Sequence, residues 1–215
     1  MSADPLALVE EAIGLGEESP VERLARLAAR VGPVSLAREH VLPVHPSLES
    51  LLVGGLQRGT TVAVSGVGAT TLGLVLAAGP ASRGSWAAVV GWPSLGLVAA
   101  HRAGVPLDRV AVVDDPPADQ RAPVLAALVG AFDVVLVPAS LQIGATHTRR
   151  LAARLRERGS VLVRVAGTRA GTRARDPGIG ADLHLRVTAA AWDGLGAGHG
   201  HLRGQRGGWR WERAA

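Results

Sequence analysis

The stretch LLVGGLQRGTTVAVSGVGATTL (51–72) decides the fold that we expect for this chain. A turn, GGLQRG, leads into the valine-rich segment 61–66, and a short glycine-containing loop then reaches Thr70 and Thr71 at an expected helix start. A strand that enters a helix through such a loop presents backbone N–H groups and the positive end of a helix dipole to an anion. The stretch therefore predicts the phosphate-loop corner of a parallel α/β sheet.

Alternation of strands and helices continues on the C-terminal side of this corner. Short valine-rich runs are typical of strands that are covered on both faces. The expected strands are 61–66, 86–91, 109–114, 133–138, 160–167 and 183–188. The expected helices between them are 70–78, 95–103, 118–131 and 148–158. Because strands joined by helices form right-handed crossovers, we expect an α/β fold with a doubly wound, mainly parallel sheet.

The loop departs from the standard nucleotide-binding motif at the positions that carry charge. In G-x-x-x-x-G-K-[ST], the lysine reaches the β and γ phosphates and the hydroxyl group holds magnesium. Here Ala69 stands at the lysine position, and counting back from Gly68 places Ala63 at the first glycine unless the loop is two residues shorter. We therefore expect a degenerate phosphate loop with no catalytic residue and no cofactor. Its members are Ser65, Gly66, Gly68, Ala69, Thr70 and Thr71.

Composition indicates a globular, cytoplasmic protein. The 215 residues are 47% hydrophobic and 19% charged, which excludes an intrinsically disordered chain. There is no cysteine, and hence no disulfide framework. We find no uncharged apolar run long enough for a membrane span. The acidic start of the sequence lacks the basic residues of a secretory signal.

The charge is unevenly distributed along the chain. Residues 1–140 contain nine arginines and 13 acidic residues, whereas residues 141–215 contain 14 arginines and five acidic residues. The chain contains no lysine, which a GC-rich coding sequence would explain. A basic C-terminal part suits an anionic partner such as nucleic acid.

We divide the chain into an N-terminal helical segment (1–40), a core (41–190) and a C-terminal extension rich in Gly, Arg and Trp (191–215). In the first segment Leu24, Leu27 and Val31 share one helical face. This face either packs on the core or binds a partner protein, and the sequence leaves both alternatives open.

Over residues 42–190 the chain resembles the RecA family. LPVHPSLESLLVGGLQRG (42–59) is similar to the family's entry into its first strand, and HRAGVPLDRVAVVDDPP (101–117) is similar to a segment that reads like ARKLGVDIDNLLCSQPD in RecA. FDVVLVPAS (132–140) falls where the family carries its second ATP motif. The resemblance implies a RecA-like P-loop NTPase fold with N-terminal helices.

The resemblance also places the ATPase roles of the family on residues that lack the required chemistry. The phosphate-binding lysine falls on Ala69, and the acidic residue that organises magnesium falls on Pro138. The water-activating glutamate falls on Trp92, and the glutamine that senses the γ phosphate falls near Gly167. Phosphoryl transfer depends on positioned charge and metal, so these four replacements predict a protein without ATPase activity. A cryptic ATPase that uses an arginine in place of the lysine is the alternative.

Within the RecA superfamily, the spoiled phosphate loop and the segment WDGLGAGHGHLRG (192–204) are most similar to the ImuA-type (ImuA-prime) accessory proteins of bacterial damage-induced mutagenesis cassettes. This resemblance implies a non-catalytic adaptor in SOS-induced translesion synthesis. Its partners would be an ImuB-like protein related to Y-family polymerases and an error-prone C-family DNA polymerase. A SulA-like inhibitor of cell division is the alternative, because SulA also looks like a RecA-type domain without an ATP site.

Arginines and tryptophans supply further candidate contacts. Arg169, Arg173 and Arg175 lie in a glycine-rich loop that faces DNA in RecA-type folds, where they would contact phosphates; a solvated loop is the alternative. Trp209 and Trp211 share one side of an extended segment, either as partner anchors or as part of an edge strand folded onto the sheet. The arginines of helix 146–159 are interpreted as a solvated face.

No metal site is expected, and the acidic residues have simpler interpretations. His199 and His201 have no third ligand at a regular spacing. Asp114 and Asp115 precede two prolines and are interpreted as a turn. Asp133 begins a strand, so it should lie at the edge of the sheet opposite the phosphate loop.

Overall fold

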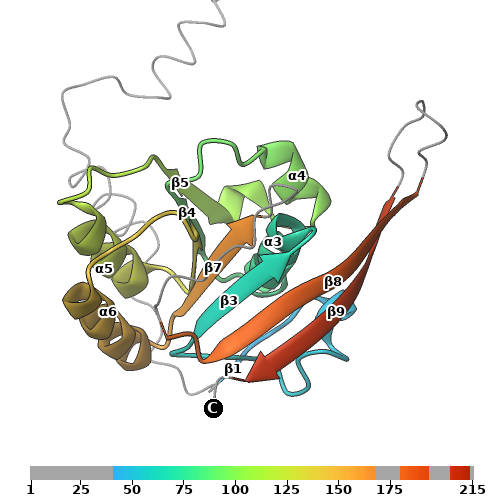
Figure 1. The fold of residues 1–215 in the computed structure, drawn as a ribbon, viewed down its shortest axis with the longest axis horizontal. Helices are drawn as coiled ribbons and strands as arrows, with labels where there is room; N and C mark the ends of the chain where they lie inside the picture. Colours follow the sequence, from blue (N-terminus) through green and yellow to red (C-terminus); the bar gives the residue numbers. More distant parts are fainter. Residues whose placement is uncertain (1–40, 168–179, 194–203, 214–215) are drawn as a thin grey trace, which may run out of the picture.

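The computed structural model describes residues 41–167, 180–193 and 204–213 (Figure 1). These ranges form a main sheet with helices on both faces and a small two-stranded sheet beside it. Two sets of expected binding residues lie outside the described ranges: Leu24, Leu27, Val31, Arg169, Arg173 and Arg175.

The elements follow the expected alternation closely. The strands of the main sheet are β3 Thr61–Gly66, β4 Ala87–Val90, β5 Val110–Val113, β6 Val134–Pro138, β7 Val161–Gly167, β8 Leu183–Asp193 and β9 Gly204–Arg213. The helices are α3 Ala69–Ala81, α4 Leu97–Arg102, α5 Arg121–Ala131 and α6 Ala145–Arg158. The small sheet pairs β1 Val41–Leu42 with β2 Leu56–Gln57, and the 3-10 turns are η1 Pro46–Leu48 and η2 Leu107–Arg109. Among the helices of the described ranges, none is both long and apolar enough to cross a bilayer.

The strand order confirms the doubly wound, mainly parallel sheet. Across the main sheet the order is β5-β4-β6-β7-β3-β8-β9, and every neighbouring pair is parallel except β8 with β9. When the six parallel strands are renumbered from 1 to 6 along the chain, their order across the sheet is 3-2-4-5-1-6. This differs from the 3-2-1-4-5-6 order of the standard dinucleotide-binding fold. It places β3 between β7 and β8.

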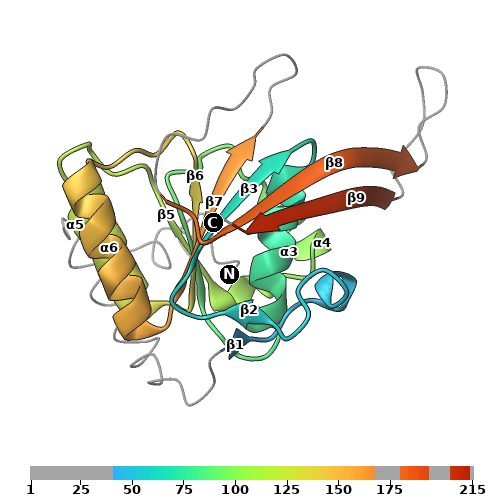
Figure 2. The same ribbon diagram turned by 60° about the horizontal axis from the view of Figure 1, so that its bottom comes forward.

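Two hydrophobic cores lie on the two faces of the sheet. Figure 2 shows α3 and α4 on one side and α5 and α6 on the other. Alternate strand residues supply the two cores, so that Val163 packs in the α3 core whereas Leu162 packs in the core below α5 and α6. Helix α3 approaches β7 closely at Gly73, where a Cβ atom would lie 2.7 Å from the Cγ2 atom of Val165. The central strands are therefore buried on both faces.

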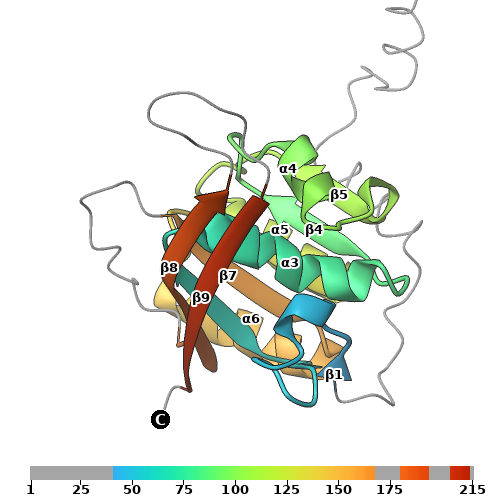
Figure 3. The same cartoon turned by 90° about the vertical axis from the view of Figure 1, so that its right-hand side faces the viewer.

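The sheet continues past residue 190, where the sequence analysis began the C-terminal extension. Strand β8 runs to Asp193, and β9 pairs with it from Leu183↔Arg213 to Asp193↔Gly204. The pairing of β3 with β8 stops at Val187, and a register shift follows between Val187 and Ala189. Beyond that shift the two strands continue as a ribbon that projects from the sheet (Figures 1 and 3).

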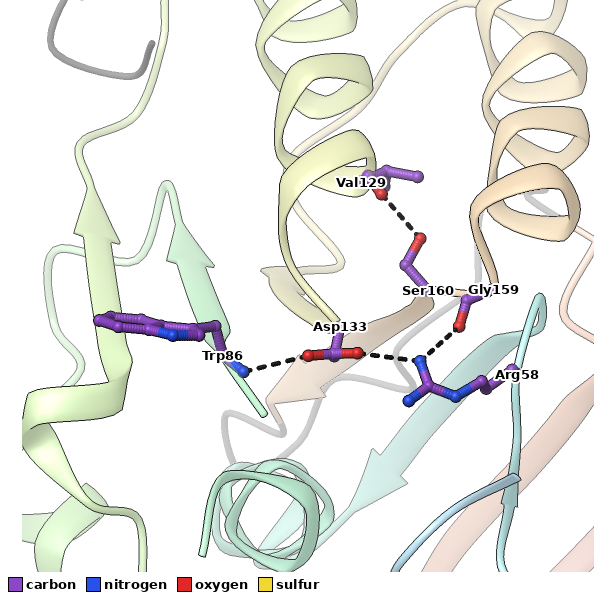
Figure 4. A network of polar contacts seen from close by, with 6 residues as sticks. All are labelled: Arg58, Trp86, Val129, Asp133, Gly159 and Ser160. Carbon is purple, nitrogen blue, oxygen red and sulfur yellow. Dashed lines mark hydrogen bonds and ion pairs between the residues drawn. The ribbon is translucent and has the colours of Figure 1, made fainter. Parts of the chain in front are cut away.

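A polar network joins the amino ends of the strands (Figure 4). The Asp133 carboxylate accepts hydrogen bonds from Arg58 Nη1 at 2.9 Å and from the Trp86 backbone N–H at 3.2 Å. Arg58 Nη1 also donates to the Gly159 carbonyl at 3.2 Å, and Ser160 Oγ donates to the Val129 carbonyl at 2.9 Å. Asp133 thus lies at the edge opposite the phosphate loop, as expected, and it ties the chain before β3 to the starts of β4 and β6.

We predict that Asp133→Asn lowers the free energy of unfolding by about 2 kcal/mol, because it removes a half-buried charged acceptor that serves two donors. Chemical denaturation measures this change. Asp119→Asn is the matched control, since Asp119 is exposed and should change stability by less than about 0.5 kcal/mol. Equal stability of the two variants would show that the network does not hold these strands together.

Candidate functional site

The connection between β3 and α3 is much shorter than a standard phosphate loop. Strand β3 ends at Gly66 and α3 begins at Ala69, so that Val67 and Gly68 alone connect them. Ala63, the position of the first glycine in a full-length motif, lies inside β3 and is buried. The shorter of the two loop alignments is therefore correct. Two loop residues offer few backbone N–H groups for a phosphate, because the cradle of the full motif is built from a longer loop.

The residue at the lysine position faces the protein interior. Ala69 is 1% exposed and belongs to the α3 core. Gly68 precedes it as the N-cap with φ of 88°, in the left-handed region, and provides no side-chain cap. Thr70 and Thr71 follow in the first turn and are half-buried. A longer side chain at position 69 would have to leave the core to reach the carboxyl edge of the sheet.

Strand β8 lies directly against this loop. Gly66 is paired in register with Val187, has φ of 99°, and approaches so closely that a Cβ atom would collide with the Val187 carbonyl oxygen. Ser65, one residue earlier, is half-buried and is paired with Arg186. Strand β8 thus occupies one side of the loop that the sequence analysis proposes.

The other positions of the family's ATPase roles lie at the same carboxyl edge. Pro138 and Gly167 end β6 and β7, and Trp92 follows β4, where it packs against the α3 core. Leu141 is 4% exposed and lies against Gly91, since a Cβ atom there would be 2.6 Å from the Leu141 Cδ1 atom. Leu141 therefore fills the space beside Gly91, and the Asp115 carboxylate also lies there, since its Oδ1 atom would be 3.3 Å from the same Cβ atom.

The acidic residues after β5 do not form the expected turn: Asp114 and Asp115 lie in an irregular segment, and the turn follows at residues 118–120. The two prolines explain this, because a residue that precedes proline favours an extended backbone. Asp115 makes a salt bridge with Arg121 at 3.1 Å, and Arg121 Nε donates to the Pro116 carbonyl at 3.2 Å. Across the described ranges no group of three or more His, Asp and Glu side chains is close enough to hold a metal ion.

Trp209 and Trp211 belong to an edge strand of the main sheet. Their backbones are paired with Val187 and Leu185, two positions of β8 whose side chains are buried in the α3 core. This confirms the edge-strand alternative for the segment itself. Their side chains lie outside what the structure describes, so their role as partner anchors stays a prediction.

Two features were missed by the sequence reasoning. One is a set of exposed apolar side chains on α4 and β5, here called the α4–β5 surface: Leu97 (48% exposed), Val98 (66%) and Val112 (54%). The run LVAA in α4 has no polar face, which is the signal that would have indicated it. The other is a cavity of about 390 Å³ between the β1–β2 sheet and the start of β8, lined by residues that include Gln57, Thr60 and Asp182. Only contacts between distant segments create this cavity.

One comparison with known proteins covers the connection between β3 and α3 and five strands of the main sheet, β3 to β7. A family model described as the MT3502 N-terminal domain matches residues 49–170, more than half of the chain. An uncharacterized protein of Mycobacterium tuberculosis (strain ATCC 25618 / H37Rv), Rv3395c, is 36% identical over 109 residues, which are 50% of this chain and 53% of the relative. The chain therefore spans about half the length of this curated relative.

We predict that Gly66→Ala is far more destabilising than Gly84→Ala. Both glycines have nearly the same positive φ, 99° and 96°, so both variants strain the backbone by about 1–2 kcal/mol. A Cβ atom at Gly84 has nothing within 4 Å, whereas one at Gly66 meets the backbone of Val187. Chemical denaturation should show at least about 2 kcal/mol of additional loss for Gly66→Ala. Equal losses of unfolding free energy in the two variants would mean that β8 does not pack closely against Gly66.

Proposed function

The chain belongs to the MT3502 N-terminal domain family, and we propose that it is a RecA-like protein that acts as a non-catalytic adaptor in SOS-induced translesion synthesis. The proposal that the protein is not a catalyst rests on the two-residue connection between β3 and α3, with Ala69 buried at the lysine position. The adaptor role and its setting are supported by the resemblance to the ImuA-type accessory proteins.

Three segments with RecA-like sequence support the RecA-like assignment by their places in the fold. The GGLQRG turn contains β2 and leads into β3, and the segment 101–117 runs from the end of α4 through β5. FDVVLVPAS (132–140) contains β6, whose carboxyl end lies at the same edge as the degenerate loop. A central strand followed directly by a helix is the layout of a phosphate-loop corner.

The side chains at four positions of the carboxyl edge support a protein without turnover. Ala69, Trp92, Pro138 and Gly167 stand at the four positions that carry charge or polarity in the ATPases of the family. Catalysis of phosphoryl transfer comes almost wholly from such groups and from magnesium. A cryptic ATPase would need an arginine in place of the lysine. That arginine would have to reach the phosphate from another position in the fold.

The adaptor role requires a surface for protein partners. The α4–β5 surface is the described candidate, because exposed apolar side chains of this kind mark protein interfaces. Leu97 and Val110 line one small cavity, which places α4 next to β5. By resemblance, the partners are an ImuB-like polymerase-family protein and an error-prone C-family DNA polymerase, and Arg169, Arg173 and Arg175 are proposed to contact DNA. Leu24, Leu27, Val31, Trp209 and Trp211 remain proposed partner contacts.

A SulA-like inhibitor of cell division would share the fold and the missing ATPase residues. The two proposals differ in the protein that stays bound. Capture of a polymerase-related protein supports the adaptor, and capture of a cell-division protein supports the inhibitor.

We predict that titration of the protein with ATP and magnesium gives no heat of binding above the dilution background. Ala69→Lys should not restore binding, because the connection between β3 and α3 stays two residues long. Isothermal titration calorimetry at millimolar nucleotide is the measurement. Saturable heat for the wild type, together with phosphate release, would replace the adaptor by a working ATPase.

We predict that the double variant Leu97→Asp/Val98→Asp reduces co-purification of an ImuB-like partner at least tenfold, because two charges would be buried in an apolar interface. Ser140→Asp/Gln142→Asp adds the same charge at exposed positions and should keep binding. Deletion of 1–31 and the substitutions Trp209→Ala/Trp211→Ala test the other proposed contacts. Substitutions suit the C-terminal segment better than its deletion, which would remove β9 from the sheet. Full binding by all of these variants would exclude the proposed surfaces.

A further inference from the structure

We propose that the outward face of α6 is a second binding surface, one that holds the phosphate backbone of nucleic acid. Helix α6 contains five arginines in 14 residues. Its exposed side chains include Arg149, Arg150 and Arg156, whereas Arg154 and Arg158 are half-buried. The sequence alone suggests a solvated face, because it does not show which arginines point outward or whether acidic residues neutralise them.

The packing of α6 holds the exposed arginines in place. Leu151 and Leu155 are buried in the core below α5 and α6. The Arg154 guanidinium group lies against α5 at Gly130, where a Cβ atom would be 2.9 Å from Nη2. Gly159, with φ of 69°, ends the helix. The helix is thus anchored along its inner side, and its outer side presents charges on a rigid support.

Within the described ranges, no salt bridge joins these arginines to an acidic side chain. The salt bridges found there join Arg58 with Asp133 and Arg121 with Asp115, and neither involves α6. Glu157 is the single acidic residue of the helix. Three exposed guanidinium groups therefore remain available to an anion, and arginine suits phosphate oxygens because it donates two parallel hydrogen bonds.

The chemistry of the face favours a nucleic-acid backbone over a protein. Protein interfaces have an apolar core, but the apolar side chains exposed on α6 are only those of Ala145 and Ala153. The helix contains no aromatic residue to stack on a base. Arg149 and Arg156 are two turns apart, about 10.5 Å along the axis, which matches about three phosphates of one strand. Binding should therefore be sequence-independent and strongly dependent on salt.

This surface goes beyond the proposed adaptor function. It does not depend on the identity of a polymerase partner, and it is distinct from Arg169, Arg173 and Arg175 in the sequence. A protein that fails to capture any polymerase would still bind nucleic acid through α6.

The test uses the full chain and fluorescence anisotropy with a labelled duplex DNA over a series of salt concentrations. Arg149→Ser/Arg150→Ser/Arg156→Ser should weaken binding at least tenfold at low salt. It should also reduce the slope of log K against log salt by about 2.7, which corresponds to three phosphate contacts. The matched control is Arg83→Ser/Arg102→Ser/Arg186→Ser, which removes three exposed arginines from other elements and should stay within threefold of the wild type.

Three results would overturn the proposal. The wild type fails to bind duplex DNA, or both triple variants lose affinity equally, or the α6 variant loses binding to polyglutamate but not to DNA. The last result would assign the face to an acidic protein. All six substituted arginines are exposed, so both triple variants should unfold at the same temperature as the wild type. Equal unfolding temperatures would show that a loss of DNA affinity does not come from unfolding.

Discussion

The two-residue connection between β3 and α3 determines how side chains and backbone pack around it at the carboxyl edge of the sheet. Because only Val67 and Gly68 connect strand and helix, α3 must begin where β3 stops, and the first helical side chain turns into the core. Gly66 then packs directly against the backbone of β8. Close packing of this kind leaves no room for a lysine or for a longer loop, since protein interiors contain few voids. The junction therefore differs from a standard phosphate loop in its length as well as in the residue at position 69.

The two edges of the sheet are held together by different contacts. At the carboxyl edge Leu141 packs against Gly91, and Asp115 makes a salt bridge with Arg121. The amino edge carries the polar network centred on Asp133, which joins strands together. The groups proposed for interaction lie on outer surfaces, namely the α4–β5 surface and the outward face of α6. This distribution agrees with the proposed role in binding, where affinity comes from surfaces and a catalytic pocket is not needed.

Much of the fold was predictable from local pattern. Valine-rich runs such as 61–66 and 133–138 became strands at nearly the expected bounds, because β-branched residues buried on both faces have few other stable arrangements. The position of Asp133 also followed from its place at the start of a strand, whereas the turn expected at Asp114 and Asp115 was wrong, since the turn lies at residues 118–120. The site was predicted less completely: the alternative with Ala63 in the loop was wrong, and β9 was only one of two alternatives for its segment.

Residue type and near-neighbour spacing are sufficient to specify the alternation of strands and helices and the missing charges at Ala69 and Pro138. Both are properties of short stretches of chain. The length of the junction after β3, the addition of β9 to the sheet edge and the choice of outward arginines on α6 depend on segments far apart in sequence. Gly66 meets Val187, and Arg58 meets Asp133, across intervals that no local pattern spans. Those features exist only once the packed sheet brings the segments together, because each of them is a contact between two distant parts of the chain.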